Sequence, residues 1–307
     1  MAESKSWEQD TLQKLLFETL KEQRRKRRWN IFFKLIFFSL AAFIIFSTNS
    51  TDFILTKPHT AVIAIHGIIA SGNQASADNV IAALEKAFDE KNTQGIILDI
   101  NSPGGSAVQA SYIYNEIVRQ RALHKNIPLY ATCQDACASA AYYIASGAQA
   151  IYANPASLVG SIGSLIDGFG FTGTMDKLGV QRRLITSGMN KGFLDPFSPL
   201  SKEDEAYAKH MLDEVHSLFI HDVKQGRGNR LKITDETFSG RVWTGISGKA
   251  LGLIDGFGSV ETITRDILKS KNIIRYNDEN DLLQQLSGRF TSSLKQSIKS
   301  ELAPSIS

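Results

Sequence analysis

Residues 95–106 read Gly-Ile-Ile-Leu-Asp-Ile-Asn-Ser-Pro-Gly-Gly-Ser. The first six residues are mostly apolar, which is typical of a buried strand, and the paired glycines permit the backbone conformations of a tight turn. Ser106 then begins a helical pattern that continues to residue 125. A buried strand that turns directly into a helix is a building block of α/β folds.

The same alternation continues on both sides of this stretch. Strands are predicted at 61–65, 128–132 and 150–153, and helices at 79–88 with Asp78 as its cap, at 139–146, and at 201–225 with one buried face. This order predicts an α/β fold whose parallel strands are joined by right-handed crossovers.

A basic cluster and an apolar run precede this domain. Six of the eight residues from Lys21 to Arg28 are basic, and residues 31–46 contain only Lys34 as a charge. Cations that flank an apolar run favour a membrane segment with its N-terminus in the cytoplasm. The run begins too late for a cleaved secretory signal, and a buried core helix is the weaker alternative.

These features divide the chain into five parts. We expect a cytoplasmic basic segment at 1–28, a transmembrane anchor at 29–47, a linker at 48–60, an exported domain at 61–270 and a C-terminal tail at 271–307. The tail is polar but has apolar residues at helical spacing, so we expect an amphipathic helix that packs on its own domain, on a neighbouring subunit or on the membrane.

Composition excludes several classes of function. The net charge of +3, from 34 basic and 31 acidic residues, predicts no nucleic-acid partner. The two cysteines are too few for a disulfide framework, and neither they nor the scattered histidines have the spacing of a metal site. We therefore expect no metal and no other cofactor.

One hexapeptide, Leu-Ile-Asp-Gly-Phe-Gly, occurs at residues 165–170 and again at 253–258. The sequences around the two copies do not match. We interpret the repeat as recurrent turn chemistry and not as a domain duplication.

Two segments carry candidate chemistry close to predicted strand ends. In Asn101–Ser106 the glycines allow a backbone amide to approach a substrate and face a developing oxyanion, although the same residues also suit a simple tight turn. Ser139 begins a helix among small residues, where it is either a nucleophile or an N-cap. Cys137 is a rival nucleophile, but no histidine between His124 and His210 is available to activate it.

Lys191 is the candidate general base. A lysine can act as a base near neutral pH only if its pKa falls by about three units from the reference value of about 10.4. Removal of water by apolar neighbours lowers a lysine pKa, and Phe193, Leu194 and Phe197 are suitable neighbours. A carboxylate as near as Asp195 would oppose this change.

These segments resemble those of a known family when taken together. The turn at 101–105, the run at 139–143, Gly160–Gly163, the segment at 187–197 and the later Gly240–Gly245 followed by Gly252–Asp255 have the residue types and the order of the signal peptide peptidase A family, peptidase family S49. The resemblance extends from about Ala61 to Ile267. It implies the repeated β-β-α units of the Clp protease and crotonase superfamily.

The resemblance also implies roles for individual residues. Ser139 matches the nucleophile and Lys191 the general base, while Gly105 and the N–H of Ala140 match the oxyanion hole. Ser161 matches the hydroxyl that orients the lysine. The implied function is that of a membrane-anchored serine endopeptidase of the bacterial inner membrane, with an exported catalytic domain that degrades apolar peptides such as cleaved signal peptides.

Assembly and two alternatives follow from the same comparison. Short family members with one domain form homo-oligomers such as ring-like octamers, so the Ser–Lys pair can be completed between neighbouring subunits. The chain has Ala140-Ala141 where the family usually has two glycines, which leaves a catalytically idle membrane scaffold as one alternative. A crotonase-like acyl-CoA enzyme is the other, and export away from cytosolic cofactor argues against it.

Overall fold

The structure is a computed structural model that describes residues 3–55 and 57–277. In the first range, side chains are described only for residues 11–42, with residue 13 excepted. The predicted amphipathic helix of the tail lies largely at 278–307, outside the described residues. The chain divides into two compact units, of which the larger comprises residues 57–279.

One long helix, α1 (Glu3–Leu55), makes up the described part of the smaller unit. The predicted anchor at 29–47 is helical throughout, and many of its described apolar side chains, including Trp29 and Phe37, are exposed. The described residues nevertheless include no helix that is long and apolar enough to cross a membrane. The predicted spanning segment is therefore not confirmed.

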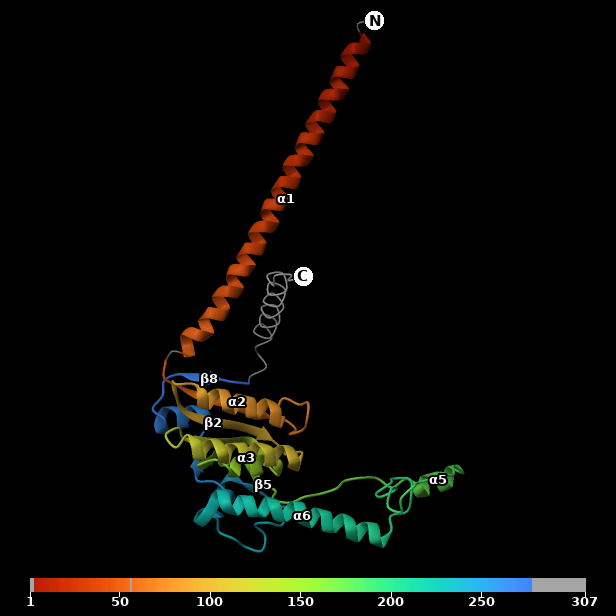
Figure 1. Ribbon diagram of the computed structural model, residues 1–307, viewed down its shortest axis with the longest axis vertical. Helices are drawn as coiled ribbons and strands as arrows, with labels where there is room; N and C mark the ends of the chain where they lie inside the picture. Colours follow the sequence, from red (N-terminus) through yellow and green to blue (C-terminus); the bar gives the residue numbers. More distant parts are fainter. Residues whose placement is uncertain (1–2, 56, 278–307) are drawn as a thin grey trace, which may run out of the picture. The chain divides into compact units, whose positions relative to one another are not determined.

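The larger unit is built on one sheet (Figure 1). Its strands are β1 (His59–His66), β2 (Thr93–Ser102), β3 (Leu129–Ala138), β4 (Ala150–Ala153), β5 (Leu158–Gly160), β6 (Val242–Thr244), β7 (Gly256–Phe257) and β8 (Ile273–Arg275). The order is β6-β5-β3-β2-β1-β8, and β4 pairs with both β3 and β7. The described pairs are parallel except β5 with β6. The sheet forks at β3, whose first half pairs with β4 and whose last residues pair with β5.

Helices cover both faces of the sheet. They are α2 (Ala77–Asp89), α3 (Ala107–Leu123), α4 (Ala140–Ser146), α5 (Thr172–Leu178), α6 (Lys202–Arg227), α7 (Gly245–Ala250) and α8 (Val260–Thr262), with short 3₁₀ and π turns at Gly228–Arg230 and Ile263–Ile267. Because successive strand residues face opposite sides, Ile96 and Leu98 enter the main core with α2, α3, α4 and α6. Ile97 enters a smaller cluster beneath α8.

The predicted α/β alternation with parallel strands is confirmed, and the differences lie at element ends. Ser76, not Asp78, caps α2, because its hydroxyl accepts the Asn79 amide. β3 continues to Ala138, well beyond its predicted end. β8 lies beyond residue 270, the predicted end of the domain, and its backbone pairs with the edge of β1.

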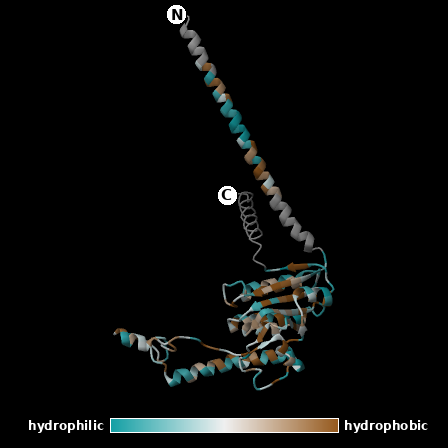
Figure 2. Ribbon diagram, turned by 180° about the vertical axis from the view of Figure 1, so that it is seen from behind, coloured by the Kyte–Doolittle hydropathy of each residue, from teal (hydrophilic) through white to brown (hydrophobic). Residues whose placement is uncertain are grey.

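A long segment of the larger unit lacks a core of its own. None of residues 163–218, which we call the arm, is buried, and it includes α5 and the first two thirds of α6. Hydrophobic stretches are visible along it in Figure 2, and Leu165, Ile185 and Met189 are more than three quarters exposed. The single buried face predicted for residues 201–225 is therefore wrong for most of α6, whose buried residues begin at Phe219.

Candidate active site

The site forms where β2 and β3 end side by side. Ser102 pairs with Cys137 in the sheet, so the turn after β2 lies next to the residue that follows β3. A Cβ atom on Gly104 would lie 2.8 Å from the Cβ of Ser139, which leaves room for glycine alone at that position. Two predicted segments far apart in the sequence are thus in direct contact.

Ser139 stands in a strained backbone conformation between β3 and α4. Its φ is 55° and its ψ is −126°, and its amide donates to Gly160 O at 2.8 Å. Non-glycine residues are held in such conformations only by their surroundings, and they cluster at functional sites. Its side chain makes no capping hydrogen bond, so the N-cap alternative does not account for the hydroxyl.

The alanines that follow Ser139 carry no such strain. Ala140 and Ala141 belong to α4, and neither has a positive φ. Glycine would therefore gain nothing at these two positions. The departure from the glycine pair has no conformational cost in this fold.

The backbone amide of Gly105 faces the region that Ser139 and Ala140 also face. Ile69 donates to Gly104 O at 3.0 Å and accepts from the Ser106 amide at 2.8 Å, which makes Gly105 the bridge partner of Ile69. In a parallel bridge of this kind the flanking residues make the bonds, so the amide of Gly105 faces the opposite side. That side is a pocket that Gly105 lines together with Ser139 and Ala140.

Alanine at Gly105 should destabilise the domain. The added Cβ would lie 2.1 Å from Ile69 O, and φ at this position is 148°. We expect the free energy of unfolding to fall by about 3 kcal/mol, from backbone strain and overpacking together. Urea denaturation at one fixed protein concentration measures this. The control is Gly168→Ala, since Gly168 has open space around it; equal stability of the two variants would contradict the close approach.

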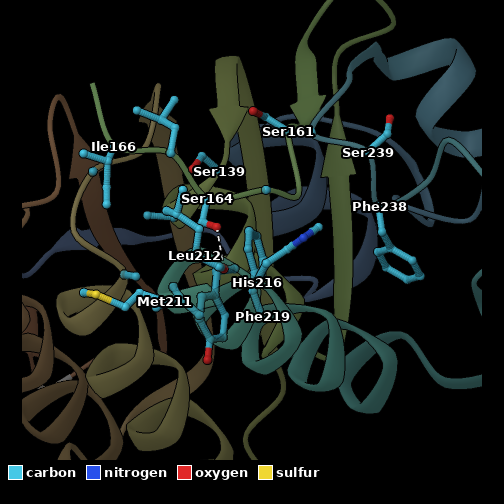
Figure 3. A pocket seen from close by; sticks show the side chains of 18 of the residues that line it. Ser139, Ser161, Ser164, Ile166, Met211, Leu212, His216, Phe219, Phe238 and Ser239 are labelled. Carbon is cyan, nitrogen blue, oxygen red and sulfur yellow. Dashed lines mark hydrogen bonds between the residues drawn. The ribbon is translucent and has the colours of Figure 1, made fainter. Parts of the chain in front are cut away.

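The pocket has a volume of about 820 Å³ and brings together four of the five predicted site residues. Ser139, Gly105, Ala140 and Ser161 all line it. Across from them, α6 contributes Met211, Leu212, Val215, His216 and Phe219, and further apolar walls come from Ile166 and Phe238 (Figure 3). The described lining contains no Asp or Glu side chain.

Tyr143 forms a polar contact at the base of this pocket. Its hydroxyl donates a short hydrogen bond to the Asp222 carboxylate, and its ring stacks on Phe219 with centroids 4.7 Å apart. Burial and this hydrogen bond raise the pKa of Tyr143, so the phenol is neutral at physiological pH. The contact fixes α6 to α4 beneath the pocket.

Lys191, the fifth predicted residue, does not line the pocket. It lies on the arm and its side chain is exposed, so within one chain Phe193, Leu194 and Phe197 do not shield it from water. The carboxylate of Asp195 was expected to oppose the loss of a proton from Lys191, but it is bound by other side chains. Its carboxylate accepts hydrogen bonds from Ser198 and from Arg182, which hold the pKa of Asp195 below its usual value.

The arm around Lys191 is ordered by contacts of its own. Phe171 stacks on Phe197 with ring centroids 5.4 Å apart, and the Phe171 amide donates to Pro196 O at 2.7 Å. Phe193 meets the ring of Tyr207 on α6 edge to face at 5.4 Å. The lysine therefore lies on a loop with packing contacts of its own, outside the pocket that Ser139 lines.

Cys137, the rival nucleophile, lies in a different environment from that of Ser139. Cys137 is fully buried and does not line the pocket. Burial raises the pKa of its thiol well above the ordinary value, so the reactive thiolate is disfavoured. In the described part of the chain, no group of three or more His, Cys, Asp or Glu residues is placed to hold a metal ion.

His216 is a pocket residue that the sequence did not single out. The Nε2 atom of His216 lies 3.0 Å from Ile162 O. The helical pattern of α6 could not indicate that this contact reaches the residue next to Ser161, which lines the pocket. The walls from Phe238 and Ser239 had no sequence signal either.

Two protein-family models match the chain. Peptidase family S49 matches residues 121–273, and Clp protease matches residues 56–158. Together they cover the sheet, the turn at Gly105, the strand that leads to Ser139 and the arm. The parallel α/β sheet is consistent with a Clp protease-like fold.

Similar proteins have several names. The chain is 39% identical over 209 residues to a Brucella abortus protein named Na⁺/H⁺ antiporter NhaA. The aligned residues make up 66% of this chain and 28% of that protein. It is 29% identical over 203 residues to Protease 4 of Haemophilus influenzae, covering 65% of this chain and 32% of that protein. The chain thus spans about a third or less of these two relatives.

A third relative is matched over most of its length. A Synechocystis protein, whose name describes it as a putative protease, is 32% identical over 206 residues, which cover 67% of this chain and 72% of that protein. With a match of this extent, and with the S49 model running through Ser139, the pocket and the arm to residue 273, the chain belongs to peptidase family S49.

Proposed function

We propose that the protein is a serine peptidase in which Ser139 is the nucleophile and Lys191 of a neighbouring copy of the chain is the general base. The observation that carries this proposal is the arrangement around Ser139. Its backbone is held at a positive φ, its side chain makes no capping bond, and it faces an apolar pocket beside the amides of Gly105 and Ala140.

The reaction follows from these positions. Neutral Lys191 removes the Ser139 proton, and the serine oxygen attacks a peptide carbonyl. The amides of Gly105 and Ala140 stabilise the oxyanion as it forms. The protonated lysine then gives its proton to the leaving amine, and water activated by the same lysine hydrolyses the acyl-enzyme.

Placement of the base in a neighbouring copy is supported by the arm. Lys191 is exposed on a segment without buried residues, and that segment carries a large exposed apolar surface. Association of copies would bury this surface, and burial beside a lysine also lowers its pKa. A homo-oligomer such as a ring, with active sites shared across each boundary, meets both requirements.

The pocket favours apolar peptide substrates. Ile166, Phe238 and the apolar face of α6 all contribute to its wall, so apolar side chains gain most by entering it. Peptides of the kind released from secretory signals have this character. The absence of a carboxylate among the lining residues argues against crotonase-like proton transfer.

The idle-scaffold alternative loses its main argument in this fold. It rested on strain at Ala140-Ala141, and both residues are in ordinary helical conformation. A scaffold would also have no need of a strained serine that faces a pocket.

Labelling by a serine-directed acylating probe tests the proposal. We expect the full-length protein to be modified at Ser139, with mapping of the adduct by mass spectrometry. Labelling should be blocked by an apolar peptide that fills the pocket. Modification elsewhere, or none, would contradict the assignment of Ser139.

We also propose that the N-terminal helix attaches the protein to a membrane. Most of the large apolar side chains between Trp29 and Leu40 are exposed on α1, and the basic cluster at 21–28 precedes them. We expect the full-length protein to remain with membranes in alkaline carbonate, and a variant that begins at residue 57 to be released. Equal extraction of both forms would exclude the attachment.

A further inference from the structure

His216 connects α6 to the pocket segment that contains Ser161. It is partly buried, and its Nε2 atom lies 3.0 Å from the carbonyl oxygen of Ile162. Figure 3 shows its ring among the α6 side chains that face the pocket. A second hydrogen bond joins the same two segments one turn earlier, where Ser164 Oγ donates to Leu212 O at 2.8 Å.

His216 contacts the segment of residues 160–162, which connects several parts of the proposed site. Gly160 O accepts the Ser139 amide at 2.8 Å, and the Ser161 amide donates to Arg241 O at 2.7 Å. Ser161 has a φ of 52°, which a non-glycine residue keeps only when its neighbours enforce it. Ile162 O, bonded to the Gly240 amide at 3.1 Å and to His216, is the next anchor along the chain.

The acceptor determines what the imidazole can do there. A carbonyl oxygen accepts hydrogen bonds and cannot donate, so Nε2 of His216 must carry the proton. Both the neutral Nε2–H tautomer and the imidazolium satisfy this condition. Nε2 is therefore unable to take a proton from Ser139 while it is bound to Ile162. The role of this hydrogen bond is to hold the two segments together.

Burial is confined to the C-terminal part of α6. The arm between residues 163 and 218 contains no buried residue, so hydrophobic burial does not fix its position. Burial resumes only at Phe219, which stacks on Tyr143. The two hydrogen bonds made by His216 and Ser164 therefore link the pocket segment to a part of the helix that has no buried residue.

We infer that His216 is a positioning residue for the peptidase reaction. Its hydrogen bond to Ile162 holds Ser161 in the strained conformation from which the Ser161 hydroxyl orients the catalytic lysine. This inference rests on the proposed function, in which Ser161 contacts the incoming Lys191. It adds a residue from α6 to a site otherwise built from strand ends and the loop that carries Lys191.

Two substitutions separate positioning from simple packing. His216→Phe retains a planar ring but removes the donor, and His216→Gln places an amide donor near the position of Nε2. For cleavage of an apolar fluorogenic peptide by the full-length protein, we expect His216→Phe to lower kcat by about 10- to 100-fold. KM should stay within about twofold, because ground-state binding is unchanged. His216→Gln should recover most of the lost kcat.

A matched control and a second readout complete the test. His221, an exposed histidine on the same helix, bonds only to Gln225 a turn away, and His221→Phe should leave kcat unchanged. The rate of Ser139 labelling by the acylating probe should fall in His216→Phe in parallel with kcat. Thermal unfolding of each variant shows whether the fold is intact.

The outcomes are distinct. An unchanged kcat in a folded His216→Phe variant overturns the inference, as does a raised KM at constant kcat, which would make His216 a substrate contact. Failure of His216→Gln to recover activity also overturns it, since the donor would not be what matters. If wild-type protein shows no labelling at Ser139, the proposed function has failed instead.

Discussion

Alanine in place of Ser139 should lower the cleavage of an apolar peptide by about 1,000-fold or more. Alanine lacks the oxygen that attacks the carbonyl, so only substrate binding and the oxyanion amides of Gly105 and Ala140 remain. The measurement is the rate of cleavage of a fluorogenic apolar peptide by the purified full-length protein. The strained backbone at position 139 costs alanine no more than serine, so we expect the variant to fold normally.

Two controls make this result specific. Ser71→Ala changes an exposed serine and should keep full activity. Cys137→Ala removes the rival thiol, and because that thiol is buried with a raised pKa, cleavage should persist. Activity that survives in Ser139→Ala but is lost in Cys137→Ala would transfer the role of nucleophile to the cysteine.

Local sequence was sufficient where a segment makes its own structure. The apolar run of β2, the glycine turn and the helix that starts after Ser106 are each encoded within a few residues, and all three are found. Because β2 and β3 are parallel neighbours, their ends must also meet. That topology brings together Gly105, Ser139 and Ala140, which the resemblance to the family had grouped.

The repeated hexapeptide shows where local sequence is insufficient. In the copy at 253–258, Leu253 is fully buried and the Asp255 carboxylate is bound by the buried guanidinium of Arg227 at 2.7 Å. In the copy at 165–170, Leu165 is 79% exposed. The six residues are identical, so the difference comes from their surroundings: the copy at 253–258 packs in the main core and against Arg227 of α6.

The position of Lys191 could not be predicted for a related reason. The pattern of α6 correctly indicates an apolar face, but a pattern cannot indicate whether that face is covered by the same chain or by another. In this chain Met211, Val215 and Leu218 are exposed, and the lysine they accompany on the arm is exposed as well. In the proposed function, the lysine that completes the site therefore comes from another copy of the chain.

Loss of the Lys191 amine should be as damaging as loss of the Ser139 hydroxyl. We expect Lys191→Ala to lower peptide cleavage by about 1,000-fold, since serine is a weak nucleophile without an adjacent base. Lys191→Arg should be equally inactive, because a guanidinium keeps the charge but does not give up its proton near neutral pH. Lys177→Ala, which removes another exposed lysine of the arm, should retain activity. An active Lys191→Arg variant would mean that position 191 supplies only a positive charge.

A mixture of two inactive variants decides which chain supplies the lysine. Ser139→Ala and Lys191→Ala are dissociated together in equal amounts, reassembled and assayed. If each site takes its serine from one copy and its lysine from the next, an intact pair forms at about one boundary in four, and about a quarter of the wild-type activity returns. If the pair lies within one chain, no boundary can restore it and the mixture stays inactive. Recovery should also depend on protein concentration, because the exposed arm must find a neighbour before its amine can leave water.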